Sequence, residues 1–213
     1  MSFVSILSQK SDKIVIFPRN KPFGTLFVID KSEYNYLKER RITMNFNNFT
    51  IKAQEAVQEA VNLTQAHNGQ VIEPIHLLQA VMKVGENVTK FIFQKLGVNG
   101  QQIANVVARQ IESLPKVSGG NPYLSRESND VLQKAVQYSK EMGDEFVSIE
   151  PIILALLVVK STASSILKDA GVSEKELREA INELRKGERV TSQSSEDTYQ
   201  SLEKYAINLC EAA

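Results

Sequence analysis

The residues that could do chemistry are few, and none of them stands in a catalytic pattern. The chain has two histidines, His67 and His76, and a single cysteine, Cys210. The histidines lack the HExxH spacing of a zinc protease, and one cysteine excludes a cysteine-rich zinc site. No glycine is followed by lysine, so the sequence has no P-loop. We therefore predict no catalytic residue, no metal site and no cofactor site in this chain.

Each of these residues also has a structural interpretation. His76 falls on an apolar stretch, which favours a core or boundary residue over a metal ligand. His67 stands near the end of a predicted helix, where an imidazole complements the helix dipole. Cys210 follows Leu209 on an amphipathic stripe, which favours a buried thiol over a nucleophile.

Acidic residues are plentiful, but they do not form a catalytic set. Glu73 and Glu150 each precede a proline, where we expect their side chains to lie at the positive N-terminal ends of helices. The other carboxylates are spread over charged helix faces. Nothing in the sequence brings an acid, a base and a nucleophile together, so we predict that this chain is not an enzyme.

Composition narrows the possible partners. The 213 residues contain 25 Lys and Arg against 25 Asp and Glu, so no net field attracts nucleic acid or an anionic membrane. The longest apolar run, residues 151–159, is far shorter than the roughly 20 residues of a membrane-spanning helix. A single cysteine and the lack of a secretory signal favour a cytoplasmic location.

The first 43 residues differ from the rest of the chain. They carry a net charge of +4, whereas residues 44–213 carry −4. Two β-branched and aromatic runs, at 13–17 and 25–30, flank a turn-rich stretch and predict a hairpin. We interpret residues 1–43 as an upstream extension that does not match the pattern of the following residues, and Met44 as the true start. The alternative is a genuine but weakly ordered tail.

From Met44 onward the sequence predicts helices, and the pattern occurs twice. The run EPIHLLQAV (73–81) recurs as EPIILALLV (150–158), and the N-cap residue Thr50 is answered by Ser125. A turn-forming break at 115–122 separates the copies. We therefore predict an all-α, pseudo-twofold bundle of two four-helix repeats, 44–114 and 123–186.

The end of the chain has a different character. Residues 187–195 are polar and predict a flexible linker. A final amphipathic segment carries Tyr199, Leu202 and Tyr205 on one face, and no other part of the sequence is an obvious partner for it. An uncovered apolar stripe of this kind indicates that 187–213 is a linker followed by the opening helix of a further domain.

The doubled segments FTIKAQEAVQEAVNLTQAHNGQVIEPIHLLQAV and LSRESNDVLQKAVQYSKEMGDEFVSIEPIILALLV resemble the tandem Clp N-terminal repeat. The resemblance covers residues 44–186. The tail SSEDTYQSLEKYAINLCEAA is similar to the linker and first ATPase-domain segment of ClpB-type members of the Clp ATPase family. The chain is thereby identified as the N-terminal part of such a chaperone, ending before the first ATPase domain.

The resemblance implies a function that composition alone does not. ClpB-type proteins are hexameric AAA+ machines that thread aggregated polypeptides through a central pore, in cooperation with the DnaK system. Their N-terminal domains engage unfolded or aggregated clients. ATP and Mg²⁺ are then expected only in the ATPase domains, and this segment on its own is expected to be a monomeric binding module.

The resemblance also implies a site. In family members an apolar groove with a polar rim lies between the repeats, and the rim positions match Thr50, Asp144 and Glu150. The predicted apolar contacts are Val131, Leu132, Ala135 and Tyr138. Each also has a structural alternative: Thr50 as a helix cap, Asp144 in a turn after glycine, Glu150 at a helix start and the others as core.

Three other functions compete with client binding by a disaggregase. A free-standing Clp-repeat adaptor would use the same fold without a motor. A small hydrolase would need a catalytic set that the sequence lacks. A DNA-binding helical protein would need a basic recognition helix, which near-zero net charge argues against.

Overall fold

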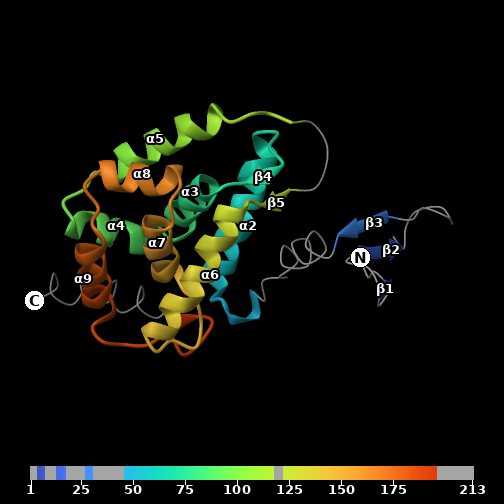
Figure 1. The fold of residues 1–213 in the computed structure, drawn as a ribbon. Coiled ribbons are helices and arrows are strands. Elements are labelled where there is room, and N and C mark those ends of the chain that lie inside the picture. The colour runs from blue at the N-terminus through green and yellow to red at the C-terminus, as the bar shows by residue number, and fades with distance from the viewer. Residues whose placement is uncertain (1–3, 8–12, 18–26, 31–45, 118–121, 196–213) are drawn as a thin grey trace, which may run out of the picture. The chain divides into compact units, whose positions relative to one another are not determined.

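The structure is a computed structural model that describes residues 4–7, 13–17, 27–30, 46–117 and 122–195 (Figure 1). It divides into two compact units, Met1–Asn45 and Phe46–Ala213. In the first unit, β1 (Val4–Leu7), β2 (Lys13–Phe17) and β3 (Phe27–Asp30) form an antiparallel sheet in that order. The predicted hairpin is confirmed as β2 and β3, whereas β1, on the other edge of β2, was not predicted.

The second unit is mostly helical, which confirms the all-α prediction. Its described elements, in chain order, are η1 (Phe46–Asn48), α2 (Ile51–Ala66), β4 (Val71–Ile72), α3 (Pro74–Val84), α4 (Glu86–Lys95), α5 (Gly100–Glu112), β5 (Tyr123–Leu124), α6 (Arg126–Glu141), α7 (Ile149–Val158), α8 (Thr162–Asp169) and α9 (Glu174–Arg185). No single helix among the described residues is long and apolar enough to span a membrane, and only α7 and α8 taken together, bent by 92°, meet the criteria of length and composition.

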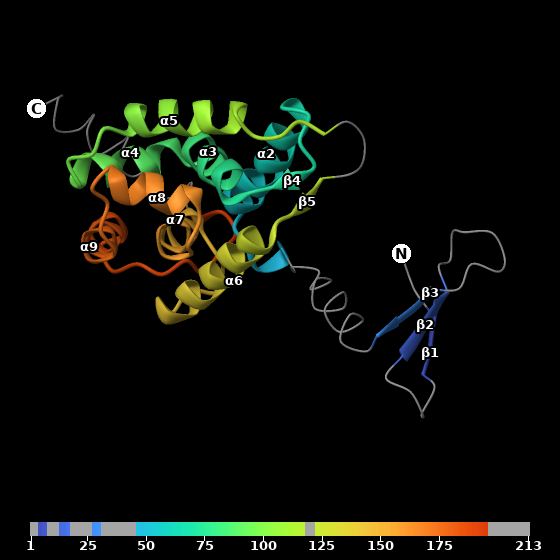
Figure 2. The ribbon, with the colours of Figure 1, turned by 45° about the horizontal axis from the view of Figure 1, so that its top comes forward.

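The two helical sets, α2–α5 and α6–α9, pack against each other around α3 and α7 (Figures 1 and 2). Every residue of α7 from Ile149 to Leu157 is buried, because this helix is apolar on nearly all sides. On the outside, α5 of the first repeat lies beside α8 of the second, and α4 contacts α9. The interface between the repeats therefore has an edge where α5 meets α8.

Local sequence signals explain where the helices begin. The Thr50 hydroxyl accepts the backbone N–H of Ala53 at 3.2 Å, and the Ser125 hydroxyl accepts that of Ser128 at 3.0 Å. Pro74 is the first residue of α3, where its missing N–H costs nothing. These predicted helix starts are confirmed.

Two short strands join the repeats. β4 and β5 pair in parallel, with Val71 opposite Tyr123, and the Ser128 hydroxyl donates to the Ile72 carbonyl at 2.6 Å. The expectation that the chain is helical throughout after Met44 is wrong at these residues. A two-residue strand is too short to show the alternation by which a strand is recognised in a sequence.

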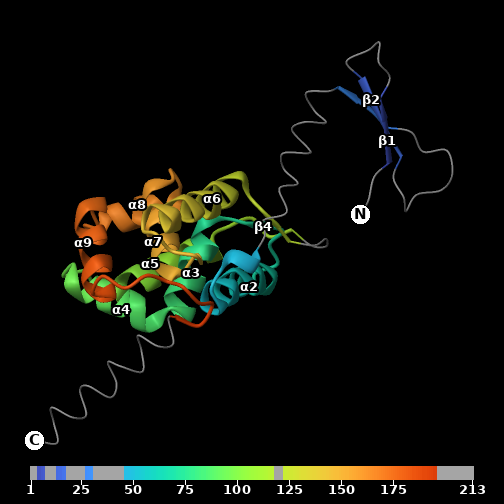
Figure 3. The ribbon, with the colours of Figure 1, turned by 90° about the horizontal axis from the view of Figure 1, so that it is seen from below.

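Residues 187–195, which we call the C-terminal strap, are held against the helical unit. Val190 is fully buried, and its carbonyl accepts the Glu145 N–H at 2.9 Å. The Gln193 carbonyl accepts the Ile51 N–H at the start of α2, also at 2.9 Å. Figure 3 shows the strap in red, running from the end of α9 to the start of α2. The prediction of a flexible linker is wrong for these residues, and the predicted amphipathic segment after 195 lies outside the described residues.

Candidate functional site

The two predicted acidic rim residues converge on one buried arginine. Arg185 donates from Nη1 to Asp144 Oδ2 at 2.7 Å and from Nε to Glu150 Oε1 at 3.0 Å. The side chains of Asp144, Glu150 and Arg185 are 0%, 1% and 5% exposed, respectively. Arg185 Nη2 also donates to the Ser148 hydroxyl at 2.9 Å. These groups form what we call the Arg185 network.

The Arg185 network has structural consequences. Burial alone would lower the pKa of Arg185, but Glu150 and Asp144 outweigh it, so the pKa is raised and the guanidinium stays charged. Asp144 Oδ1 accepts the Val190 N–H of the strap at 3.0 Å. The network therefore links the turn before α7, the end of α9 and the strap. Glu150 Oε2 is buried without a hydrogen-bond partner.

The other five residues that were predicted to contact a client are also buried in the helical unit. Thr50 is fully buried as the cap of α2. Val131, Leu132 and Ala135 are fully buried on the face of α6 that packs against α7. Tyr138 is 3% exposed, and both Lys134 and Arg178 lie 4.8 Å from its ring centroid.

A client docking on the surface of this conformation would not reach the seven predicted side chains. The structure brings the predicted rim residues Asp144 and Glu150 together through Arg185, which sequence reasoning missed. Contact between these seven residues and a client stays a prediction, and it would require the domain to open.

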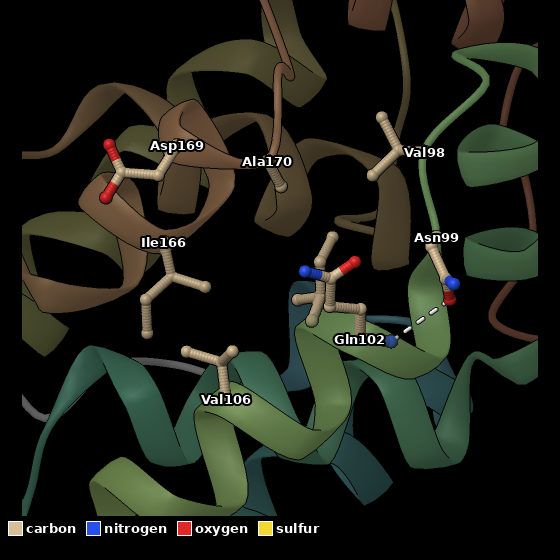
Figure 4. Close-up of a pocket in the computed structure, with 8 residues that line it drawn as sticks. Val98, Asn99, Gln102, Val106, Ile166, Asp169 and Ala170 are labelled. Carbon is tan, nitrogen blue, oxygen red and sulfur yellow. Dashed lines mark hydrogen bonds between the residues drawn. The ribbon is translucent and has the colours of Figure 1, made fainter.

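The described part of the chain has surface hollows, and two of them are candidate binding sites. The first lies between α5 and α8, at the edge of the interface between the repeats, and has a volume of about 320 Å³. We call it the α5–α8 hollow (Figure 4). Its lining residues are Val98, Asn99, Gln102, Ile103, Val106, Ile166, Asp169 and Ala170.

The α5–α8 hollow has an apolar floor and a polar margin. Val106 from α5 faces Ile166 from α8 across it, and both are half-buried (Figure 4). Asn99 and Asp169 are exposed at its margin, and the Asn99 side chain accepts the Gln102 N–H at 3.1 Å. An apolar hollow with a polar rim between the repeats is the kind of site that the family resemblance implies, but it is built from other residues.

The second hollow lies where the end of α2, β4 and the start of α3 meet the end of α5. We call it the β4–α5 hollow; its volume is about 220 Å³. Its lining residues are His67, Gly69, Gln70, Val71, Glu73, His76, Ile111, Leu114, Pro115, Val117 and Tyr123. Val117 and Tyr123 on its rim are 48% and 52% exposed.

Two ionisable groups in the β4–α5 hollow have shifted pKa values. Burial, then the charge of His67, lowers the pKa of His76 to about 4, although a hydrogen bond with the Glu73 backbone opposes this. Burial raises the pKa of Glu73, and the nearby charge of Glu127 raises it further. His76 is thus neutral at neutral pH.

Within the described ranges, no group of three or more His, Cys, Asp or Glu side chains is placed to hold a metal ion. His76 is buried on an apolar helix and His67 is the C-cap of α2, so both lie where the sequence predicted them. Cys210 lies outside the described residues.

Comparison with known proteins connects this fold to a family. Residues 48–168 match the family described as the Clp repeat (R) N-terminal domain. The chain is 81% identical over 170 residues to chaperone protein ClpB of Bacteroides thetaiotaomicron and 56% identical to that of Porphyromonas gingivalis. Each match covers 80% of this chain and 20% of the relative, so the chain spans about a fifth of their length.

Solved structures agree on the fold. The Hsp104 N-terminal domain from Candida albicans superposes with a TM-score of 0.64 at 22% identity, covering 70% of this chain and 99% of that one. A ClpV N-domain in complex with a VipB peptide gives a TM-score of 0.54 at 16% identity, covering 64% and 86%. Because the identities are low, these likenesses concern the fold alone.

Proposed function

The chain belongs to the family of Clp repeat N-terminal domains, and from this premise we propose that it is the polypeptide-binding domain of a ClpB-type disaggregase. The observation that carries the proposal is the 81% identity to a ClpB chaperone over 170 residues. In this proposal the whole protein is a hexameric, cytoplasmic ATPase that threads aggregated clients in cooperation with the DnaK system. ATP and Mg²⁺ then bind in its ATPase domains, and the present chain has no catalytic role.

We place client capture in the α5–α8 hollow. Its half-buried apolar side chains offer contact to an exposed apolar segment of an unfolded protein, and its polar margin offers hydrogen bonds to the client backbone. A hollow of about 320 Å³ accommodates only a few side chains. Binding should therefore be weak and quickly reversible, which suits a domain that passes its client on to a motor.

The proposal is tested by the binding of a labelled, permanently unfolded model protein, reduced and carboxymethylated α-lactalbumin, measured by fluorescence anisotropy. Val106→Ser and Ile166→Ser should each weaken binding about three- to tenfold, because each removes apolar contact area from the hollow. Val61→Ser is the matched control: this valine is also half-buried on a helix of the first repeat but lies outside both hollows. Equal losses in all three variants would contradict the assignment to this hollow, and no binding by the unchanged chain would contradict the function.

A free-standing Clp-repeat adaptor is the alternative function. It would bind one folded partner and show no preference for unfolded chains. The same titration with native α-lactalbumin in place of the unfolded form distinguishes the two, because a disaggregase domain should bind only the unfolded form.

A further inference from the structure

The β4–α5 hollow is not used in the proposed function, yet it combines an acidic group, a neutral donor and an apolar rim. Glu73 is the N-cap of α3 and lines the hollow. Glu127, in the first turn of α6, is close enough to raise the pKa of Glu73. No salt bridge in the described part of the chain involves either carboxylate. The negative charge here is therefore not compensated by an ion pair.

The neighbouring histidine does not supply the missing positive charge. His76 Nδ1 accepts the Glu73 backbone N–H at 3.1 Å, so the ring hydrogen is on Nε2. With a pKa of about 4, the ring is neutral at neutral pH. The hollow thus presents an N–H donor beside a carboxylate that caps α3 but has no ion-pair partner, and a bound cation would relieve the repulsion between Glu73 and Glu127.

The rest of the hollow is suited to an extended chain. Tyr123 and Val117 expose about half of their surface at its rim, an unusual exposure for large apolar residues in this domain. The β4–β5 sheet has two strands, so β4 is paired on one edge only. The carbonyls of Gln70 and Ile72 accept hydrogen bonds from the β5 side, so by strand alternation Val71 directs its N–H and C=O away from β5. An extended peptide is bound by such free main-chain groups next to side-chain pockets.

We propose that the β4–α5 hollow binds an extended polypeptide segment in which a large apolar side chain stands beside a cationic amine. The apolar side chain packs against Tyr123 and Val117, and the amine pairs with Glu73 under the field of Glu127. A lysine side chain and a free amino terminus both supply this chemistry. The inference rests on the proposed function, since it names a second client-binding site on the same domain and the kind of segment that the site prefers.

The test uses a fluorescein-labelled ten-residue peptide of Ser, Thr and Val that contains one Leu–Lys pair, acetylated at its N-terminus. The same peptide with Glu in place of Lys, and a third with a free N-terminal Leu and no Lys, separate the two sources of the amine. We expect the full chain to bind the Lys peptide or the free-terminus peptide roughly two- to fivefold more tightly than the Glu peptide, the range for a partly exposed ion pair.

Glu73→Gln should abolish this preference, and Tyr123→Ala should weaken all three peptides. Glu86→Gln and Ile51→Ala are the controls, because they alter an exposed acid in the first turn of α4 and an exposed apolar residue on α2, both away from the hollow. Thermal unfolding of each variant checks that the fold is retained. Peptide-induced shifts of the Val71 and Tyr123 resonances should locate the site.

The outcomes separate this inference from the proposed function. If unfolded α-lactalbumin binds but the chain does not distinguish the charged peptides, or Glu73→Gln and Glu86→Gln behave alike, the second site is refuted and the function stands. If neither the unfolded protein nor any peptide binds, both proposals fail.

Discussion

At the scale of single residues, the two acidic side chains predicted at the rim form buried ion pairs. Asp144 and Glu150 were predicted as part of a polar rim because the family resemblance implies such a rim at these positions. Ionised side chains are rarely buried unless they are paired. Their partner, Arg185, lies 41 and 35 residues away in the sequence, and nothing in a linear pattern reveals such a pairing. The structure shows that the pairing exists and that it holds the strap.

Replacing Arg185 should be far more costly than replacing an exposed arginine. Arg185→Met leaves Asp144 and Glu150 buried without a counter-charge, so the free energy of unfolding should fall by about 3–5 kcal/mol in urea titrations. Arg109→Met is the control, because Arg109 is exposed on α5 and donates from Nε to the Asn105 carbonyl at 3.4 Å, so its replacement should cost about 1 kcal/mol or less. Equal losses for the two variants would mean that the Arg185 network does not hold the domain together.

His76 should make stability depend on pH. Its pKa is about 4 in the folded protein against an ordinary 6.5, so between these values the unfolded chain binds more protons. The contribution to stability is complete above pH 6.5 and is lost as the pH falls from 6.5 to 4, by at most about 3 kcal/mol. The raised pKa of Glu73 acts in the opposite direction, contributing stability that is lost as the pH rises.

The variant His76→Gln isolates the histidine. A glutamine at this position can still accept the Glu73 N–H, as in a capping box, but it does not titrate. Urea midpoints measured at pH 7.5, 6 and 4.5 should therefore fall more steeply for the unchanged chain than for the variant. Parallel slopes would rule out His76 as the titrating group.

At the scale of helices and strands, local sequence signals predicted where helices begin but did not predict the two short strands β4 and β5. Thr50, Ser125 and Pro74 mark helix starts because capping depends on the nearest four residues. The two-residue strands β4 and β5 were missed because their pairing lies more than 50 residues apart in the chain.

The internal repeat gave one wrong prediction, which concerns the residues that cap α3 and α7. Glu73 and Glu150 occupy matching positions in the sequence and were expected to cap matching helices. Glu73 is indeed the N-cap of α3, but Glu150 is the second residue of α7, whose N-cap is Ser148. The Ser148 hydroxyl accepts a hydrogen bond from Arg185 instead of capping the helix. The duplicated sequence therefore keeps the helix order, while the contacts at the start of each helix have diverged.

The site that we propose could be predicted in kind but not in detail. A duplicated helical unit implies a seam between its copies, and the α5–α8 hollow lies at such a seam. Val106 and Ile166 were not selected because a half-buried apolar residue at a seam and a core residue have the same helical spacing. Only the packing of α5 beside α8 distinguishes them.

At the scale of the whole molecule, the strap joins parts of the helical unit that are far apart in sequence. Gln193 donates from its side chain to the Asn47 carbonyl at 2.9 Å and accepts the Ile51 N–H, so it holds the start of the first repeat. Val190 is held against the turn between α6 and α7 of the second repeat by Asp144 and Glu145. The strap thereby connects the turn before α7 to η1 and to the start of α2.

The boundary of the folding unit should therefore lie beyond the last helix. A fragment of residues 44–186 keeps both repeats but loses the strap, which leaves Asp144 Oδ1 and the Ile51 N–H without these partners and exposes the pocket that Val190 fills. The free energy of unfolding of 44–186 should be about 2–4 kcal/mol lower than that of 44–195. This difference is what remains of the stabilisation by the buried Val190 side chain and the hydrogen bonds of the strap, because the entropy lost in ordering the strap offsets part of it. Val190→Ser within 44–195 should reproduce much of that loss, because this side chain is the buried anchor of the strap. If urea denaturation gave the two fragments the same free energy of unfolding, the strap would not contribute to the stability of the domain. The domain boundary at Lys186 would then be correct.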